Sequence, residues 1–133
     1  MNLWINLYAR DVQKLAHFYQ ELGFQPIPTF PATETEAGFH VGETTVMIFK
    51  QGFFEQVIPH TMRTPSPHPT VLLSFDLPSI EEAEGWVKKA ISLGGQDLNV
   101  HEMAKKPGFY NTGFIDLEGY YWNILVREVA KNK

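Results

Sequence analysis

The chain repeats one order of predicted elements, a strand, a helix and three further strands, and this repeat sharply limits the folds open to it. The first copy, from residue 3, contains the segments LWINLYA, VQKLAHFYQEL, FQPIP, EAGFHVG and TTVMIFK. The second copy, from residue 70, contains TVLLSF, IEEAEGWVKKAISL, DLNVHEM, FYNTGFID and YYWNILVREV. Strands are predicted where apolar side chains alternate, and helices where they recur every three or four residues. The copies therefore predict two modules of one topology.

Both predicted helices carry start and stop signals. Asp11 can cap the first helix, and Gly23 ends it because glycine tolerates the left-handed conformation found there. Ser79 and Glu82 fit a capping box at the start of the second helix, which Gly94 and the following glycine end. The apolar face of each helix is expected to pack on a sheet. These faces consist of Val12, Leu15, Tyr19 and Leu22 in the first helix and of Ile80, Ala83, Val87, Ala90 and Ile91 in the second.

A proline-rich stretch, FFEQVIPHTMRTPSPHPT, separates the two copies. Proline lacks the backbone N–H that helices and central strands need, so the stretch predicts a stiff, extended connection. A chain of 133 residues fits one domain. We expect module one at about 1–58, the connection at about 59–69 and module two at about 70–128.

Composition and charge exclude several classes of function. The net charge of −4 argues against a nucleic-acid partner, which requires a basic face. The chain has no cysteine, which excludes disulfides, zinc thiolates and thiol catalysis. The first residues, MNLWINLYARD, lack the basic and apolar regions of a signal peptide, and no apolar run is long enough to span a membrane. We therefore expect a cytoplasmic protein with no membrane partner.

The segment GFIDLEGYYWNILVREV predicts a β-hairpin. Asp116 favours the first position of a tight turn, and Gly119 favours the fourth. Apolar and aromatic residues flank the turn on both sides. Asn123 lies four residues beyond the glycine, on the second strand of the hairpin.

These segments resemble the vicinal oxygen chelate superfamily, which includes glyoxalase I, extradiol dioxygenases and bleomycin-resistance proteins. ARDVQKLAHFYQELGFQP is similar to the family's V-x-D-x-x-x-x-x-x-F-Y-x-x-L-G-F motif, and DLEGYYWNIL is similar to its D-P-D-G-x-x-x-E hairpin. The likeness covers about residues 3 to 126. It implies an α+β fold in which two tandem βαβββ modules form a curved mixed sheet. Helices would cover its convex face, and a ligand cleft would lie on its concave face.

In the metal enzymes of this family, four positions supply His, Gln or Glu ligands. Counting from the motifs places these positions at Trp4, around Ile48, at Thr70 and at Asn123. A divalent metal needs nitrogen or oxygen donors, and only Thr70 and Asn123 offer oxygen. Neither is charged. We therefore expect no metal, no cofactor and no catalytic residue at the family's site.

Strand alternation divides the predicted site from the predicted core. Leu3, Ile5, Leu7, Val71, Leu73 and Phe75 are expected to face the helices. Large rings that line a concave surface suit a flat or apolar small molecule, with a few polar groups to orient it. The predicted ligand-binding residues are Trp4, Asn6, Tyr8, Phe49, Thr70, Leu72, Ser74, Tyr121 and Asn123. Phe18, Phe24, Trp86 and Trp122 are predicted core residues.

Three functions remain open. The one we favour is a metal-free protein that binds a small, largely apolar or aromatic molecule between the modules, as drug-sequestering bleomycin-resistance proteins do. The alternative is a metal-dependent glyoxalase-like lyase, isomerase or dioxygenase with atypical ligands. The third is an interaction module whose cleft is filled by its own rings. The resemblance also implies a homodimer. Among the five histidines, which form no metal-binding spacing, His40 is the one expected to face the cleft.

Overall fold

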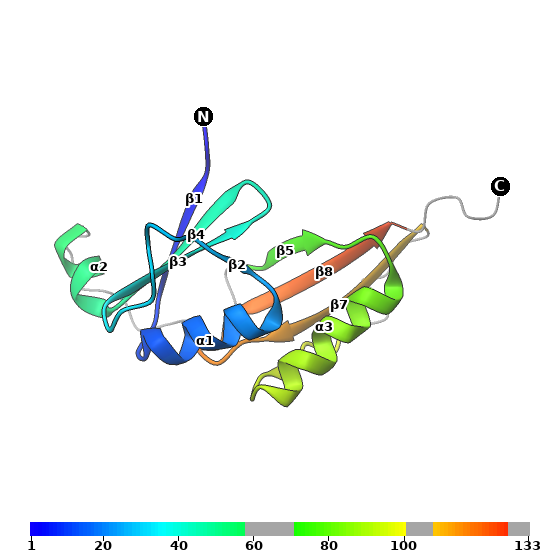
Figure 1. Ribbon diagram of the computed structural model, residues 1–133. Coiled ribbons are helices and arrows are strands. Elements are labelled where there is room, and N and C mark those ends of the chain that lie inside the picture. The colour runs from blue at the N-terminus through cyan, green and yellow to red at the C-terminus, as the bar shows by residue number, and fades with distance from the viewer. Residues whose placement is uncertain (58–70, 101–107, 128–133) are drawn as a thin grey trace. The chain divides into compact units, whose positions relative to one another are not determined.

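The computed structural model describes residues 1–57, 71–100 and 108–127. It divides into two compact units, Met1–Pro67 and His68–Lys133, and each unit is described by itself. Within each unit one helix lies along one side of a small sheet (Figure 1). Among the described residues, no helix is long and apolar enough to cross a membrane.

The first unit contains a four-stranded mixed sheet. Its elements are β1 (Trp4–Tyr8), α1 (Val12–Leu22), β2 (Gln25–Pro26), β3 (Glu36–Val41), β4 (Thr44–Phe49) and α2 (Gln51–Val57). The strand order is β1-β4-β3-β2. β1 runs parallel to β4, and the other neighbours are antiparallel. The connection from β1 to β4 runs through α1, β2 and β3 and makes the crossover that two parallel strands need.

The second unit repeats this topology. Its elements are β5 (Leu73–Asp76), α3 (Ile80–Ser92), β6 (Gln96–Asp97), β7 (Phe109–Ile115) and β8 (Tyr121–Arg127). The strand order is β5-β8-β7-β6, with β5 parallel to β8 and the other pairs antiparallel. The doubled order and the α+β class predicted from the sequence are confirmed.

The predicted N-caps of both helices and the glycine stop of α1 are confirmed. The Asp11 side chain accepts a hydrogen bond from the Lys14 N–H at 3.1 Å, and the Ser79 hydroxyl accepts one from the Glu82 N–H at 3.1 Å. Gly23 follows α1 with a φ of 132°, a value that side-chain-bearing residues rarely adopt. Its N–H donates to the carbonyl of Tyr19, which satisfies one group at the helix end.

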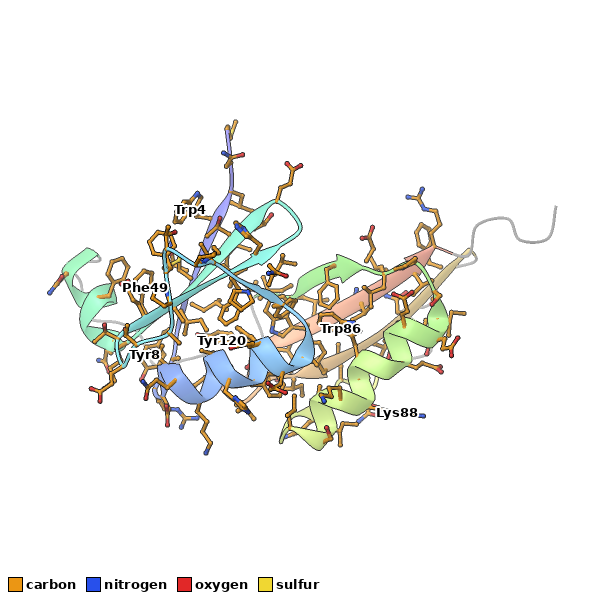
Figure 2. The ribbon with its side chains drawn as sticks, viewed as in Figure 1. Trp4, Tyr8, Phe49, Trp86, Lys88 and Tyr120 are labelled. Carbon is orange, nitrogen blue, oxygen red and sulfur yellow. The ribbon has the colours of Figure 1, made fainter. Side chains whose placement is uncertain are left out.

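Aromatic side chains pack each helix onto its sheet. In the first unit, the buried Tyr19 ring lies 5.3 Å from the Phe24 ring and 5.6 Å from the Phe39 ring. In the second unit, the Phe75 ring lies 5.1 Å from Trp86 of α3, and the Phe114 ring stacks on Trp122 at 6.1 Å. The core positions predicted for Phe18, Phe24 and Trp122 are confirmed. Trp86 of α3, labelled in Figure 2, is half-buried.

Three local predictions are wrong. Leu3 and Val71 are exposed rather than packed against a helix, because β1 begins at Trp4 and β5 begins at Leu73. Ile91 is 47% exposed. The buried face of α3 consists of Ala83, Val87 and Ala90, and Ile91 lies at its edge.

The start of the proline-rich stretch was also predicted incorrectly. Residues 53–57 were expected to be extended but belong to helix α2. No proline lies within this helix, and the Phe53 ring stacks on Phe49 at 3.7 Å. Residues 58–70, which include all four prolines of the stretch, lie outside the described residues.

A hydrogen bond between Tyr110 and Glu84 joins β7 to α3. The Tyr110 hydroxyl donates to the Glu84 carboxylate at 2.7 Å. Burial, and then this hydrogen bond, raise the pKa of Tyr110 above its ordinary value of 10.0. A group whose pKa is raised by folding contributes its full stabilisation at pH values below its pKa in the unfolded chain. That contribution is lost as the pH rises through its pKa in the folded state.

We expect Tyr110→Phe to lower the free energy of unfolding at neutral pH, because it removes this hydrogen bond. The loss should be only about 1 kcal/mol, since the pair is partly exposed. The difference from the unaltered protein should shrink above about pH 10, where the phenol begins to lose its proton in the unfolded chain. Urea unfolding of both proteins across this range checks this. A difference that stays constant with pH would contradict a role for the phenol's proton.

Candidate functional site

Each sheet has one face toward its helix and an opposite face, which we call the open face. In the first unit the helix face is fixed by Phe39, whose ring touches Tyr19 of α1. Phe39 is in register with Val46, and Val46 with Ile5. Because side chains alternate along a strand, the open face carries the residues between these. They are Trp4, Asn6 and Tyr8 of β1, Glu36, Gly38 and His40 of β3, and Thr45, Met47 and Phe49 of β4.

The aromatic residues of this open face differ in how available they are. Trp4 is 50% exposed, and its ring meets the Phe30 ring at a centroid distance of 6.1 Å with the planes at 79°. Phe49 is buried, and its ring is stacked on Phe53 with the planes at 13°. Tyr8 is half-buried. Trp4 is therefore the predicted ring with the most free surface, whereas Phe49 already has an internal stacking partner.

The second metal position was expected around Ile48, and the register shows which residue of that stretch lies on the open face. Ile48 is in register with Leu7 and lies on the helix face, fully buried. The open-face residue beside it is Met47, which is 2% exposed and in register with Asn6 and Gly38. A thioether is a soft donor that suits copper(I) rather than the harder divalent ions. This assignment thus leaves the chemical conclusion for this position unchanged.

The open face of the second unit carries a polar cluster centred on Asn123. Asn123 is 7% exposed and in register with Ser74 on one side and Gly113 on the other. Its side-chain amide donates to the Ser74 hydroxyl at 3.2 Å, and its carbonyl oxygen accepts from the Asn111 amide at 3.3 Å. The buried amide is thus satisfied on both sides by neighbouring strands, as a buried polar group must be.

The turn before β8 fixes where Asn123 lies. The Gly119 N–H donates to the Asp116 carbonyl at 3.1 Å, which closes the predicted turn. The buried Asp116 carboxylate accepts hydrogen bonds from the N–H groups of Glu118 and Tyr120 at 2.9 and 3.0 Å. It also accepts one from the Trp122 indole N–H at 3.0 Å. The residue that opens the turn therefore anchors the start of the strand that carries Asn123.

The two registers define which positions of the units correspond. Asn6, Met47 and Gly38 lie side by side in the first unit. Ser74, Asn123 and Gly113 occupy the same places in the second. By this correspondence the counterpart of Trp4 is Leu72, not Thr70. Leu72 directly precedes β5 and is 56% exposed, and Thr70 lies outside the described residues.

The donor set of the described residues does not fit a divalent metal. In the part of the chain that the structure describes, no three His, Asp or Glu side chains form a group that could hold a metal ion. His40 lies on the open face in register with Thr45, as predicted, but is exposed, and His17 is exposed on α1. His60, His68 and His101 lie outside the described residues. Among the family's metal positions that the structure describes, Asn123 is the one with a side-chain oxygen, and its amide is neutral.

The structure brings the predicted site residues together in two groups, one in each unit. Trp4, Asn6, Tyr8 and Phe49 share the first open face, and Ser74, Tyr121 and Asn123 share the second. That the two faces form one cleft stays a prediction.

Sequence reasoning missed several residues of these faces, among them Phe30, Met47 and Asn111. Asn111 could have been found, since it lies two residues before Gly113 on a strand and so shares its face. Phe30 belongs to a connection between strands, where no periodic pattern indicates the direction of a side chain.

Comparisons with known proteins identify the fold and its family. A family model described as the Glyoxalase/Bleomycin resistance protein/Dioxygenase superfamily matches residues 3–124. No curated protein matches the sequence significantly. The solved structure of the hypothetical protein SA1046 from S. aureus is 30% identical and covers 95% of this chain and 93% of its own, with a TM-score of 0.76.

Two further solved structures share the fold. A glyoxalase/bleomycin resistance protein/dioxygenase family enzyme from Burkholderia phytofirmans PsJN is 21% identical, covers 93% of this chain and 96% of its own, and has a TM-score of 0.76. Lactoylglutathione lyase from Agrobacterium tumefaciens is 16% identical, covers 98% of this chain and 96% of its own, and has a TM-score of 0.63.

Proposed function

The chain belongs to the glyoxalase/bleomycin resistance protein/dioxygenase superfamily, and on that premise we propose that it is a metal-free protein that binds a small, largely apolar or aromatic molecule. Binding would work by capture, with no chemical step. The bound molecule would lie against the open faces, with Trp4 as its main contact.

The state of Asn123 carries this proposal. In the metal enzymes of the family, the resemblance places a charged glutamate ligand at this position. Here the side chain is an amide whose oxygen and nitrogen are already hydrogen-bonded to Asn111 and Ser74. Such a clamped neutral amide would leave the charge of a divalent ion largely uncompensated, and desolvating an uncompensated charge is costly. The cluster is better suited to orient a polar group of an organic molecule.

The exposed ring of Trp4 supports the same conclusion. A half-exposed indole on a sheet face offers a flat apolar surface on which a planar molecule can stack. The filled-cleft alternative predicts instead that every ring is packed, as Phe49 is against Phe53. Trp4, by contrast, meets Phe30 only edge to face and keeps half of its surface exposed, and it lies at the position that the resemblance gives as the family's first metal position.

We expect the purified protein to hold well under one divalent ion per chain after incubation with nickel, zinc, iron and manganese salts. The physical reason is the neutral, sulfur and carbon side chains at the described metal positions. Elemental analysis after gel filtration measures this. One tightly held ion per chain would overturn the proposal and favour the metal-dependent lyase, isomerase or dioxygenase with atypical ligands.

We also propose that the protein is a homodimer in solution, since closed two-fold dimers are the commonest oligomers. Light scattering behind a sizing column should then give about twice the chain mass of 15.2 kDa. A single species of the chain mass at micromolar concentration would count against the dimer and leave the binding proposal intact. The cytoplasmic location expected from the sequence stays a prediction.

A further inference from the structure

Phe30 lies over a glycine on the open face of the first unit. A methyl group added at Gly38 would lie 2.9 Å from the Phe30 Cβ and 2.9 Å from the Met47 sulfur. Both distances are shorter than side chains tolerate. The Cβ of Phe30 is also not the free end of a flexible chain, so it cannot move aside without its backbone. Gly38 therefore makes the room in which Phe30 and Met47 pack against the sheet.

The backbone fixes Phe30 in this place. Its N–H donates to the Ile27 carbonyl at 2.9 Å, and its carbonyl accepts from the Gly38 N–H at 3.0 Å. The Ile27 N–H donates in turn to the Gly38 carbonyl at 3.0 Å. These bonds hold the Phe30 backbone, and with it the Cβ from which the ring projects, before any ligand arrives. A side chain on a fixed backbone loses less conformational entropy on contact with a ligand than one on a loose backbone.

The second unit has an aliphatic side chain at the comparable place. The Leu98 N–H donates to the Gly113 carbonyl at 3.0 Å, as Ile27 does to Gly38. The Leu98 side chain lies over Gly113, because a methyl group added there would come within 2.7 Å of it. Both units therefore cover an open-face glycine with an apolar side chain from the preceding connection. In the first unit that side chain is a ring, and it stands beside Trp4.

We propose that Phe30, held over Gly38, is a specificity-determining wall beside Trp4 and restricts the ligand to a flat, uncharged aromatic group. This inference rests on the proposed function and names the class of ligand. The Trp4 and Phe30 planes stand nearly perpendicular, at 79°, so a flat group lying on one ring would be oriented for an edge-to-face contact with the other. The open-face side chains next to the two rings are Asn6, Thr45 and Met47, all uncharged. The ionisable side chains of this face lie further off on β3, His40 beyond Thr45 and Glu36 beyond Gly38. A carboxylate or ammonium group held between the two rings would lose water next to uncharged side chains.

The test uses 2-naphthol, which is flat and uncharged at neutral pH, and 2-naphthoate, which has the same rings and a negative charge. Calorimetric titration should show binding of 2-naphthol and at least tenfold weaker binding of 2-naphthoate. Phe30→Ala should weaken 2-naphthol binding by about tenfold, because one edge-to-face contact and its buried area are lost. Gly85→Ala is the matched control, since Gly85 lies on α3 with open space around it, and should leave the affinity unchanged.

A double substitution shows whether Gly38 acts through Phe30. Gly38→Ala alone should weaken 2-naphthol binding, because the new methyl displaces Phe30. Added to Phe30→Ala it should cause no further loss, since the side chain it displaces is already gone. If Gly38 acted on binding independently of Phe30, the losses of affinity from the two substitutions would add. If Gly38→Ala does not fold, the result for Phe30→Ala decides the question alone.

The outcomes separate this inference from the proposed function. Unchanged affinity in Phe30→Ala, or equal binding of 2-naphthoate, overturns the role of Phe30 as a wall for uncharged rings. Failure of 2-naphthol to bind while a broad compound screen yields another ligand overturns the class of ligand and leaves the proposed function standing. A broad screen with no ligand at all overturns both.

Discussion

Gly113→Ala should lower the free energy of unfolding by about 3 kcal/mol or more, at the upper end of what overpacking a close-packed site costs. The new methyl would overlap the carbonyl oxygen of Trp122 and would come within 2.7 Å of the Leu98 side chain. The carbonyl belongs to β8 itself, so no change of rotamer can relieve the overlap. The β7–β8 pair would have to separate where Gly113 faces Asn123. Urea unfolding followed by circular dichroism measures the change.

The control is Gly85→Ala on the exposed side of α3, where the structure leaves open space. Alanine favours a helix interior over glycine by up to about 1 kcal/mol, so this variant should be as stable as the parent or slightly more so. Equal stability of the two variants would show that β7 and β8 are not as closely paired at Gly113 as described here.

Trp4→Ala should abolish detectable binding of any compound that a thermal-shift or fluorescence screen finds. Stacking on one ring contributes about 0.5–1.5 kcal/mol beyond area burial. With the buried area, its loss weakens binding by about tenfold or more. Asn123→Ala should weaken binding less, by about 1 kcal/mol if the amide contacts the ligand. Because half of Trp4 is exposed, its removal should change the stability of the fold only slightly.

Trp86→Ala is the matched control, since it removes the same ring from α3, where the ring packs 5.1 Å from Phe75 on the helix face. This variant should lose about 2 kcal/mol of stability and keep the affinity of the folded protein. If Trp4→Ala instead only destabilises the fold, as Trp86→Ala does, and the screen yields no ligand, the binding proposal fails. The reading in which rings fill the cleft would then stand.

The sequence was sufficient to predict most of the fold because its local signals agree with its repeat. Asp11 and Ser79 cap helices where a side-chain oxygen can accept from the first turn, and Gly23 ends a helix with a positive φ. Alternation also placed Trp4 and Phe75 on the correct faces. Helix α2 was missed because the prolines that follow its seven residues led us to predict an extended chain there as well. The stacking of Phe53 on Phe49 cannot be inferred from periodicity.

The site was predicted less completely, for two physical reasons. Counting from a motif cannot fix a strand register to one residue, and an error of one residue moves a side chain to the opposite face of the sheet. The second metal position could therefore be placed only around Ile48, and the register shows that Met47 is the open-face residue of that stretch. Side chains that arrive from connections, such as Phe30, follow no strand pattern. The hydrogen bonds that clamp Asn123 also depend on which residues β5 and β7 bring beside it.

The most direct test of metal-free capture is a calorimetric titration of the tightest-binding compound from the screen into protein stripped with EDTA. The same titration is then repeated after nickel or zinc is added in excess. Metal-free capture predicts one binding constant for both samples, because Trp4 and the clamped amide of Asn123 need no ion to hold a ligand. Binding that appears only after the metal is restored would contradict metal-free capture.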